Sequence, residues 1–374
     1  MLTKSRFKSL TEKIGVTING DRPFDIQVRD GRLYKKGFAH PSLILGEGYM
    51  EGYWDCDCID ELVFLASSTE AIKLDNNLYS KLLRLGEQVL NFQNRKRSKY
   101  AVEHYNLSND FFRAMLGETM AYTCAYWKDA TTLDEAQYAK FDLICRKMYL
   151  KKGDRVLDLG CGWGSLAKFM AEKYECEVVG VNISTEQVSY AQKICKELPV
   201  KIVLSDYRDN QIYNPKKCTF DKVVSVGLCE HIGPKNYQTF FSLIRENLKE
   251  DGLFLLHTIG KNDSKDPYDP WIDKYIFPNG CLPTIQLLST ASECLFALED
   301  FHNFGVDYDK TLMAWHKNFK ANWPNFKDKY GEVFYRMWSY YLLICAGRFR
   351  ARCSHLWQMV FSPKGVLGGY KPVR

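Results

Sequence analysis

The stretch Val156–Gly164, with the sequence VLDLGCGWG, decides the fold of this chain. It continues an apolar strand pattern that begins at Arg155, and it leads directly into a helical pattern over Ser165–Tyr174. Glycines in such a turn let the backbone approach a ligand closely and adopt dihedral angles that larger side chains avoid. A G-x-G-x-G turn between a strand and a helix therefore predicts a cofactor-binding turn, with a merely structural turn as the alternative.

The alternation of strand and helix continues on the C-terminal side of this turn. We expect strands over 155–159, 177–181, 201–204, 220–226 and 253–257, and helices over 165–174, 185–197 and 235–248. This alternation predicts an α/β fold with a doubly wound, mostly parallel sheet that binds ligands at the carboxyl ends of its strands. Two later strand patterns, over 296–301 and 356–361, flank a helical stretch over 312–350, and we expect them to add an antiparallel edge.

The N-terminal part has a different pattern. Residues 1–80 contain short strand-like pieces at 15–18, 25–28 and 42–45 and an apolar segment at 59–65, which predict a small α+β domain. Apolar residues recur at helical spacing over 78–97, and the basic residues Arg95, Lys96, Arg97 and Lys99 lie at the end of this stretch. We therefore expect a helical basic linker over 81–100 and a catalytic domain over 101–374.

Composition narrows the class of protein. The chain has 374 residues, of which 46% are hydrophobic and 26% charged, which is typical of a globular protein and excludes a disordered one. Its first residues carry no apolar leader and no apolar run is long enough to span a membrane, so we expect a cytoplasmic protein. The thirteen cysteines are expected to be reduced, and the Cys56/Cys58 pair to be core rather than a metal site.

The net charge of +6 is mild, and it becomes informative only where the charges gather. The run Arg95–Lys99 suits the phosphates of a nucleic acid or of an anionic membrane, and a solvated basic face is the alternative. Arg348, Arg350 and Arg352 form a second group, for which internal salt bridges are the alternative.

The residues around the glycine turn indicate which cofactor binds there. Asp158 stands two residues before Gly160, where its carboxylate would repel a pyrophosphate but attract an ammonium- or sulfonium-bearing amino acid. The ligand predicted is S-adenosylmethionine. The second strand is followed by Asn182 in place of the acidic residue that usually binds a ribose, and Gln187 and Tyr207 are further candidates, with capping and turn roles as alternatives.

Two further side chains are candidates for the chemistry itself. Glu230 follows the fourth strand, at the edge where such sheets present groups to a substrate. His257 ends the next apolar strand, where a histidine that merely caps the sheet is the alternative. The residues alone nominate these two as catalytic candidates.

Six segments together resemble the cyclopropane fatty acid synthase family, which comprises cyclopropane-fatty-acyl-phospholipid synthases and mycolic acid cyclopropane synthases. The segments are HYNLSNDFF (104–112), YTCAYW (122–127), VLDLGCGWG (156–164), EHIGPKNY (230–237), HTIG (257–260) and YIFPNG (275–280). The glycine turn is shared by very many methyltransferases, whereas YTCAYW together with EHIGPKNY is close to a family signature. The resemblance implies a class I methyltransferase fold with a Rossmann-like sheet.

The resemblance also implies a reaction and a set of residues. The family transfers a methyl group from S-adenosylmethionine to a cis double bond in a phospholipid acyl chain and closes a cyclopropane ring, with bicarbonate as proton acceptor. The bicarbonate ligands carry over to Cys124, Glu230, His257, Ile259 (through its backbone) and Tyr308. The cofactor contacts carry over to Tyr122, Thr123, Asp158, Gly160, Gly162, Asn182, Ile183, Gln187 and Tyr207. Position 123 can be serine in the family and position 182 is often threonine, so both substitutions keep a polar side chain.

Partners follow from the same resemblance. We expect an unsaturated phospholipid as substrate, peripheral attachment to the inner face of an anionic membrane, no nucleic acid, no metal and a homodimer. Three alternatives differ in class: an acyl-chain methyltransferase with a methyl-branched or methylene product, a nucleic-acid methyltransferase and a non-catalytic binder. The second lacks an Asn/Asp-Pro-Pro-Tyr-like motif, and the intact glycine turn with Glu230 and His257 disfavours the third.

Overall fold

The computed structural model describes residues 4–35, 41–69, 107–209, 219–264 and 268–374. The chain divides into two compact units: residues 1–90, 264–278 and 308–354 belong to the first, and 91–263, 279–307 and 355–374 to the second. The helix predicted over 78–97 and the basic run Arg95–Lys99 lie outside the described residues. The division into 1–80, 81–100 and 101–374 stays a prediction.

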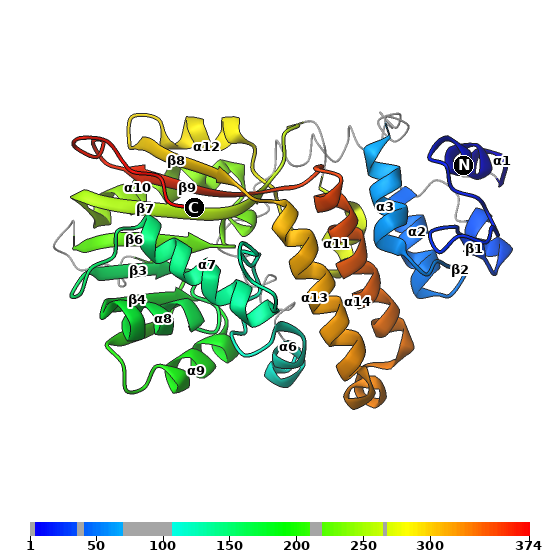
Figure 1. The fold of residues 1–374 in the computed structure, drawn as a ribbon, viewed down its shortest axis with the longest axis horizontal. Helices are drawn as coiled ribbons and strands as arrows, with labels where there is room; N and C mark the ends of the chain where they lie inside the picture. The colour runs from blue at the N-terminus through cyan, green and yellow to red at the C-terminus, as the bar shows by residue number, and fades with distance from the viewer. Residues whose placement is uncertain (1–3, 36–40, 70–106, 210–218, 265–267) are drawn as a thin grey trace. The chain divides into compact units, whose positions relative to one another are not determined.

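The second unit is built on a seven-stranded sheet with the strand order β5-β4-β3-β6-β7-β9-β8 (Figure 1). The strands are β3 (Arg155–Leu159), β4 (Glu177–Asn182), β5 (Val200–Leu204), β6 (Phe220–Val226), β7 (Leu248–Gly260), β8 (Ala297–Asn303) and β9 (His355–Ser362). Five strands, from β5 to β7, run parallel, whereas β9 pairs antiparallel with both β7 and β8. The predicted α/β class, the mostly parallel sheet and its antiparallel edge are confirmed.

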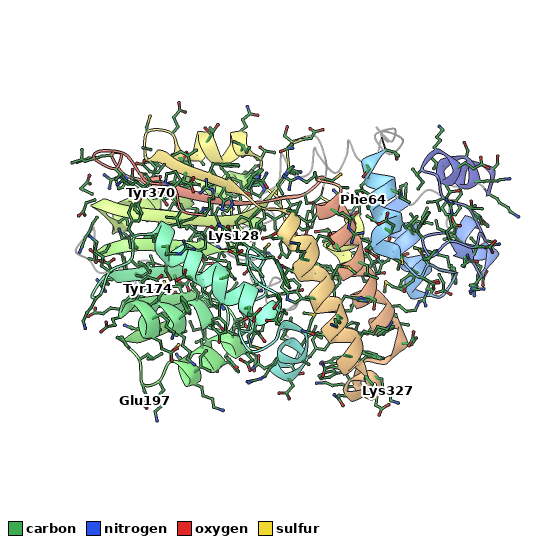
Figure 2. The ribbon with its side chains drawn as sticks, in the orientation of Figure 1. Phe64, Lys128, Tyr174, Glu197, Lys327 and Tyr370 are labelled. Carbon is green, nitrogen blue, oxygen red and sulfur yellow. The ribbon has the colours of Figure 1, made fainter. Side chains whose placement is uncertain are left out.

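Helices cover both faces of this sheet, which makes it doubly wound. The helices of this unit are α6 (Asn109–Leu116), α7 (Leu133–Lys147), α8 (Ser165–Tyr174), α9 (Thr185–Ile194), α10 (Tyr237–Asn247) and α12 (Ile285–Ser292). One core cluster joins α7, α8 and α9 to one face, and a second joins α10 and α12 to the other. Tyr174, at the end of α8, also donates a hydrogen bond to Asp142 on α7 at 2.7 Å (Figure 2).

The alternation of apolar side chains explains why the strands are buried on both faces. Along β3, Val156 belongs to one core cluster and Leu157 to the other, and along β7 Leu255 and Leu256 divide in the same way. The strands predicted over 155–159 and 220–226 and the helix over 165–174 match exactly. Helix α7 was not predicted, although its capping box of Thr132 and Glu135 is visible in the sequence.

The first unit contains mainly helices. Its elements are α1 (Lys4–Lys13), β1 (Gln27–Val28), η1 (Gly31–Lys35), α2 (Pro41–Met50), β2 (Trp54–Asp55), α3 (Ile59–Ser68), α11 (Pro270–Tyr275), α13 (Val306–Asn322, whose first two residues belong to the second unit), η6 (Trp323–Asn325) and α14 (Lys327–Arg350). β1 and β2 form a two-stranded antiparallel sheet. No helix of the residues described here is long and apolar enough to cross a membrane.

The strand predicted over 42–45 is wrong, because these residues belong to α2. Ile44, Gly46 and Gly48 are buried at a spacing of two residues, which is also the spacing of a strand face. A Cβ atom at Gly46 would lie 2.3 Å from the ring of Trp271, so the helix packs against α11 at a glycine. Strand prediction failed here because the short apolar run of residues 43–45 does not by itself distinguish a helix from a strand.

Arg350 on α14 is an internal ion-pairing residue of the first unit. Its guanidinium lies 2.8 Å from Asp60, 2.9 Å from Glu61 and 3.0 Å from Asp309. The salt-bridge alternative for this arginine is therefore confirmed.

All described cysteines are free, and the Cys56 thiol donates to the carbonyl of Pro23. Within the described ranges, no three His, Cys, Asp or Glu side chains are grouped so that they could hold a metal ion.

Candidate active site

A cavity of about 140 Å³ opens at the carboxyl ends of β3, β4 and β6. Eight of the nine predicted cofactor contacts line it: Tyr122, Thr123, Asp158, Gly160, Gly162, Asn182, Ile183 and Gln187. These residues come from three separate segments of the chain, 122–123, 158–162 and 182–187. The fold therefore brings them together at the edge of the sheet where parallel strands bind ligands.

The glycine turn has the backbone that its sequence predicts. Gly160, Gly162 and Gly164 have φ angles of +83°, +55° and +84°, in the left-handed region that favours glycine. A Cβ atom at Gly164 would lie 2.8 Å from the Cβ of Ala191 on α9, whereas a Cβ at Gly162 would meet nothing within 4 Å. Gly164 therefore serves helix packing, and Gly162 leaves open space in the lining of the cavity.

The end of β4 is organised by the side chain of Asn182. Its amide nitrogen donates to Oε1 of Gln187 at 2.7 Å and to the carbonyl of Gly162 at 3.2 Å. Its Oδ1 accepts from the backbone nitrogen of Ile183 at 2.7 Å. One neutral side chain thus holds the glycine turn, the start of α9 and the loop between β4 and α9.

Tyr207 does not line the cavity as the other eight residues do. Its ring packs edge-on against Phe240, with 5.6 Å between ring centroids, in one of the two core clusters. Burial raises the pKa of Tyr207 to about 12. The neighbouring Asp206 is held by Arg208 through contacts of 2.6 and 2.7 Å. The adenine contact of Tyr207 stays a prediction.

Lys140 of α7 is a lining residue that sequence reasoning missed. Its ammonium group donates to Oγ1 of Thr123 at 2.8 Å. Burial lowers the pKa of Lys140 to about 7, and burial raises the pKa of Asp158 to about 7. Each charge favours the ionised form of the other, so the two groups form an electrostatically coupled pair in the cavity wall.

Glu230 and Ile259 meet at the carboxyl ends of β6 and β7. Oε1 of Glu230 accepts a hydrogen bond from the backbone nitrogen of Ile259 at 2.7 Å. Oε2 is buried and has no hydrogen-bond partner among the described residues. Burial raises the pKa of Glu230 to about 7, and the bond from Ile259 opposes this rise. Among the described residues, Oε2 is therefore the oxygen of this carboxyl group that is left to accept a hydrogen bond from another group.

His257 lies two residues before Ile259 on β7 and is fully buried. The side-chain nitrogen of Gln358 on β9 lies 3.2 Å from Nδ1 of His257. Because the amide donates, Nδ1 accepts and Nε2 carries the hydrogen. Nε2 has no hydrogen-bond partner within the described part of the chain. Burial and the charges of Lys140 and Lys147 hold the pKa of His257 well below its ordinary value, so the ring is neutral.

The other two predicted ligands, Cys124 and Tyr308, make contacts of their own among the described residues. Cys124 is fully buried, and its thiol lies 3.2 Å from the carbonyl oxygen of Ala125. Tyr308 belongs to the first unit, where its ring packs against Trp315 and Phe349 with centroid distances of 5.9 and 4.5 Å. The contacts of the described residues thus connect Glu230 directly with Ile259, and the roles predicted for Cys124 and Tyr308 stay predictions.

Sequence reasoning missed Lys140 and Gln358 for different reasons. Lys140 stands on the buried face of a helix, and the capping box that begins this helix would have placed it there. Gln358 lies about a hundred residues beyond His257, so only the pairing of β7 with β9 brings them together. Cross-strand pairing at that separation leaves no local pattern in the sequence.

The sequence of this chain is similar to the sequences of known proteins. Residues 92–359 match the mycolic acid cyclopropane synthetase family. The cyclopropane-fatty-acyl-phospholipid synthase of Escherichia coli strain K12 is 50% identical over 370 residues, which cover 98% of this chain and 94% of that protein. A probable fatty acid methyltransferase of Pseudomonas putida is 37% identical over 269 residues, which cover 69% of this chain and 67% of that protein.

A solved structure has a similar fold. The mycolic acid cyclopropane synthase CmaA1, crystallised in complex with SAH and CTAB, superposes with a TM-score of 0.65 and 32% identity over 71% of this chain and 97% of its own. The predicted class I methyltransferase fold is confirmed by this likeness. Because the family match spans most of the chain and the bacterial relative covers nearly all of it, this chain belongs to the mycolic acid cyclopropane synthetase family.

Proposed function

We propose that this chain transfers a methyl group from S-adenosylmethionine to the cis double bond of an acyl chain in a membrane phospholipid and then closes a cyclopropane ring. The observation that carries the proposal is two buried atoms near the ends of β6 and β7, Oε2 of Glu230 and Nε2 of His257, for which the described residues supply no hydrogen-bond partner. They belong to the same unit as a glycine-turn cavity suited to S-adenosylmethionine. Similarity to the Escherichia coli synthase supports the choice of substrate.

The chain's own residues have three tasks in this reaction. The cavity wall holds the sulfonium compound, with the Asp158 carboxylate attracting its positive charge. The apolar surroundings exclude water, because a water molecule would add to the cationic carbon of the acyl chain. Positioning the methyl group in line with the double bond supplies much of the rate. The new carbon–carbon bond forms as the carbon–sulfur bond breaks, and loss of one proton from the transferred methyl closes the ring.

The residues present fit bicarbonate as the acceptor of that proton. Bicarbonate has one O–H group to donate and several oxygens to accept, and the site offers one buried acceptor at Glu230 and one buried donor at His257. Bound there, bicarbonate would supply a weak base that cationic carbon does not readily alkylate. Glu230 would hold its hydroxyl and His257 Nε2 one of its oxygens. The ligand roles of Cys124, Tyr308 and the Ile259 backbone are proposed from the resemblance alone.

We further propose that the chain attaches peripherally to the inner face of an anionic membrane, through the run Arg95–Lys99, and acts as a homodimer. Cationic side chains near such a surface each contribute about 1 kcal/mol to binding. Arg350 is excluded from this role, because its guanidinium is engaged by Asp60, Glu61 and Asp309. The N-terminal residues 1–80 are proposed to aid docking or dimerisation.

A second product class has one observation in its favour. The Pseudomonas putida relative is described as a probable fatty acid methyltransferase, which suggests a methyl-branched or methylene product from the same cation. The same cation either closes the ring with loss of a proton from the transferred methyl group or, after a hydride shift, loses a proton to leave a double bond in a methyl-branched or methylene chain. Identification of the product therefore separates them.

The test uses the purified chain, S-adenosylmethionine and vesicles of an unsaturated anionic phospholipid. We expect each modified acyl chain to gain one CH2 and to lose its alkene reactivity. One S-adenosylhomocysteine should form for each acyl chain modified. Vesicles of the saturated phospholipid are the control and should give no product. Product from a nucleic acid substrate, with none from the unsaturated vesicles, would overturn the proposal.

A further inference from the structure

Lys140 is the charged residue in the cofactor cavity whose purpose the proposed reaction leaves open. It projects from the buried face of α7 and is 1% exposed. Among the described residues, its ammonium group makes a single hydrogen bond, the 2.8 Å contact with Thr123. An ammonium group has three hydrogens to donate, so a buried lysine with one acceptor has two hydrogens left to donate. Burying such a charge is costly unless an anion is provided for it.

A second buried lysine on the same helix, Lys147, has an anionic partner and can be compared with Lys140. Lys147, seven residues later, is 0% exposed and lies 3.2 Å from Oδ2 of Asp300 and 3.2 Å from Nδ1 of His302. Asp300 is in turn bound by Arg374 through two contacts of 2.7 Å. Lys147 thus has an anion within contact distance inside the protein. Lys140 has no such ion pair within the described ranges.

The acidic group that shares the cavity with Lys140 is also incompletely paired. Asp158 lines the same cavity, and its Oδ2 is buried without a hydrogen-bond partner among the residues described. The two groups interact through their charges, yet no hydrogen bond or ion pair within 4 Å joins them. One cation and one anion, separated and each underused, form a complementary site for a zwitterion. The methionine part of S-adenosylmethionine is a zwitterion with an α-carboxylate and an α-ammonium group.

We propose that Lys140 binds the α-carboxylate of the methionine part of S-adenosylmethionine, with Asp158 taking the α-ammonium group. This inference rests on the proposed function, because it assigns an anchor within the cofactor site. The Thr123 hydroxyl accepts its hydrogen bond from Lys140 and so keeps its own hydrogen to donate to the same carboxylate. Gln137 of α7 holds this segment, since its amide donates to the carbonyl of Thr123 at 3.0 Å.

Bicarbonate is the other anion that a lysine near this site could attract. The cavity lining favours the carboxylate, because Lys140 lines it together with Thr123 and Asp158, whereas Glu230 and His257 are not among the described residues that line it. The two anions make different demands on an experiment. Loss of a carboxylate anchor weakens binding of the cofactor, and loss of a bicarbonate ligand raises the bicarbonate concentration needed for turnover.

The test compares two ligands that differ only in the carboxylate. The full chain is titrated by calorimetry with S-adenosylhomocysteine and with S-adenosyl-3-thiopropylamine, its decarboxylated counterpart. The wild type should prefer S-adenosylhomocysteine, and Lys140→Met should bind it about 10- to 100-fold more weakly, as expected for loss of one charge-assisted hydrogen bond. The affinity of Lys140→Met for the decarboxylated ligand should stay within about threefold of wild type, because its missing group has no anchor to lose.

Two further variants control for folding and for charge. Lys147→Met removes the other buried lysine of α7, outside the cavity lining, and should leave the preference between the two ligands unchanged. Lys140→Arg keeps the cation and should retain most of the preference. The wild-type comparison needs no variant, so a poorly folded Lys140→Met does not prevent the test.

Equal affinity of the wild type for the two ligands would overturn the inference. Equal losses for both ligands in Lys140→Met would assign Lys140 a structural role, and an increased bicarbonate requirement with unchanged ligand preference would assign it to bicarbonate. Either result also overturns the inference. A wild type that binds neither ligand would instead contradict the proposed function itself.

Discussion

The side-chain amide of Gln358 donates to Nδ1 of His257, with 3.2 Å between the two nitrogens. The two residues lie opposite each other in the antiparallel pairing of β7 with β9. The bond fixes the neutral tautomer in which Nε2 carries the hydrogen, so the ring presents a donor to the site. The antiparallel edge of the sheet thus determines which hydrogen bond the histidine can make.

Changing the tautomer should therefore change turnover. In Gln358→Glu, a carboxylate would accept from Nδ1–H and leave Nε2 as an acceptor that cannot donate to bicarbonate. We expect kcat to fall about 10- to 100-fold, a typical contribution of one positioned donor. The affinity for S-adenosylhomocysteine should stay within about twofold, because neither residue lines the cofactor cavity. Turnover at the wild-type rate in Gln358→Glu would contradict the role given to Nε2.

Glu230→Gln separates chemistry from cofactor binding. The amide keeps an oxygen to accept from Ile259 but lacks the charge that would hold the bicarbonate hydroxyl. We expect kcat to fall about 100-fold or more and the affinity for S-adenosylhomocysteine to remain nearly intact. Glu177→Gln, an exposed position on β4, is the matched control and should leave both quantities unchanged. Parallel loss of turnover and of cofactor binding would indicate a folding defect or a mistaken role.

The same substitution should alter how stability depends on pH. Burial raises the pKa of Glu230 from its ordinary value of 4.5 to about 7. Between these values the folded chain holds a proton that the unfolded chain releases, so the free energy of unfolding falls as the pH rises. Glu230→Gln removes this cost and should gain stability relative to wild type across that window, by roughly 3 kcal/mol at pH 8 and almost nothing at pH 4.

Urea unfolding of both proteins at pH 4, 6 and 8 provides the measurement. Asp158 shifts in the same direction, so the wild type keeps part of its pH dependence from that group and only the difference between the two proteins is informative. A stability difference that does not change between pH 4 and pH 8 would mean that Glu230 is not buried as an uncompensated carboxyl group.

Two glycines of the same turn should respond differently to alanine. A Cβ at Gly162 meets nothing within 4 Å, so Gly162→Ala should mainly place a methyl group in cofactor space and weaken S-adenosylhomocysteine binding about 10-fold or more. A Cβ at Gly164 would press on Ala191 at 2.8 Å, so Gly164→Ala should mainly destabilise the fold. Calorimetric binding and the melting temperature measure the two effects. A larger loss of melting temperature in Gly162→Ala than in Gly164→Ala would contradict this assignment.

Arg350→Met should destabilise the first unit and leave cofactor binding unchanged. It leaves Asp60, Glu61 and Asp309 gathered around an apolar side chain, which should cost about 1–3 kcal/mol of unfolding free energy. Arg146→Met is the control, because its pair with Asp142 is exposed and should contribute less than about 1 kcal/mol. Unchanged stability together with weaker vesicle binding would instead indicate that Arg350 contributes to membrane attachment.

The sheet was predictable because the apolar periodicity of its strands and helices lies within short stretches of consecutive residues. The apolar run of β3, the glycine turn and the helix after it occupy consecutive residues, and their boundaries were correct to the residue. Prediction failed at α2, where residues 43–45 form a short apolar run and the buried positions 44, 46 and 48 are spaced as on a strand. A short apolar run does not by itself distinguish a helix from a strand.

The site was predictable only in part, for a related reason. Asp158, Gly160 and Asn182 lie at or next to the ends of β3 and β4 and were found from their positions. Lys140 and Gln358 are defined by what they contact, Thr123 in one case and His257 in the other, and those contacts depend on tertiary packing and on long-range strand pairing. A pattern within a single segment does not contain this information.

Cyclopropane formation is tested most directly by following the three hydrogens of the transferred methyl group. The purified chain is incubated with S-adenosylmethionine that carries a trideuterated methyl group, bicarbonate and vesicles of unsaturated phospholipid, and the acyl chains are analysed by mass spectrometry. Ring closure removes one of the three labels, so we expect each modified acyl chain to gain CD2 and to lose its double bond. Retention of all three deuterium atoms in a methyl-branched chain, or no transfer to lipid at all, would contradict this expectation.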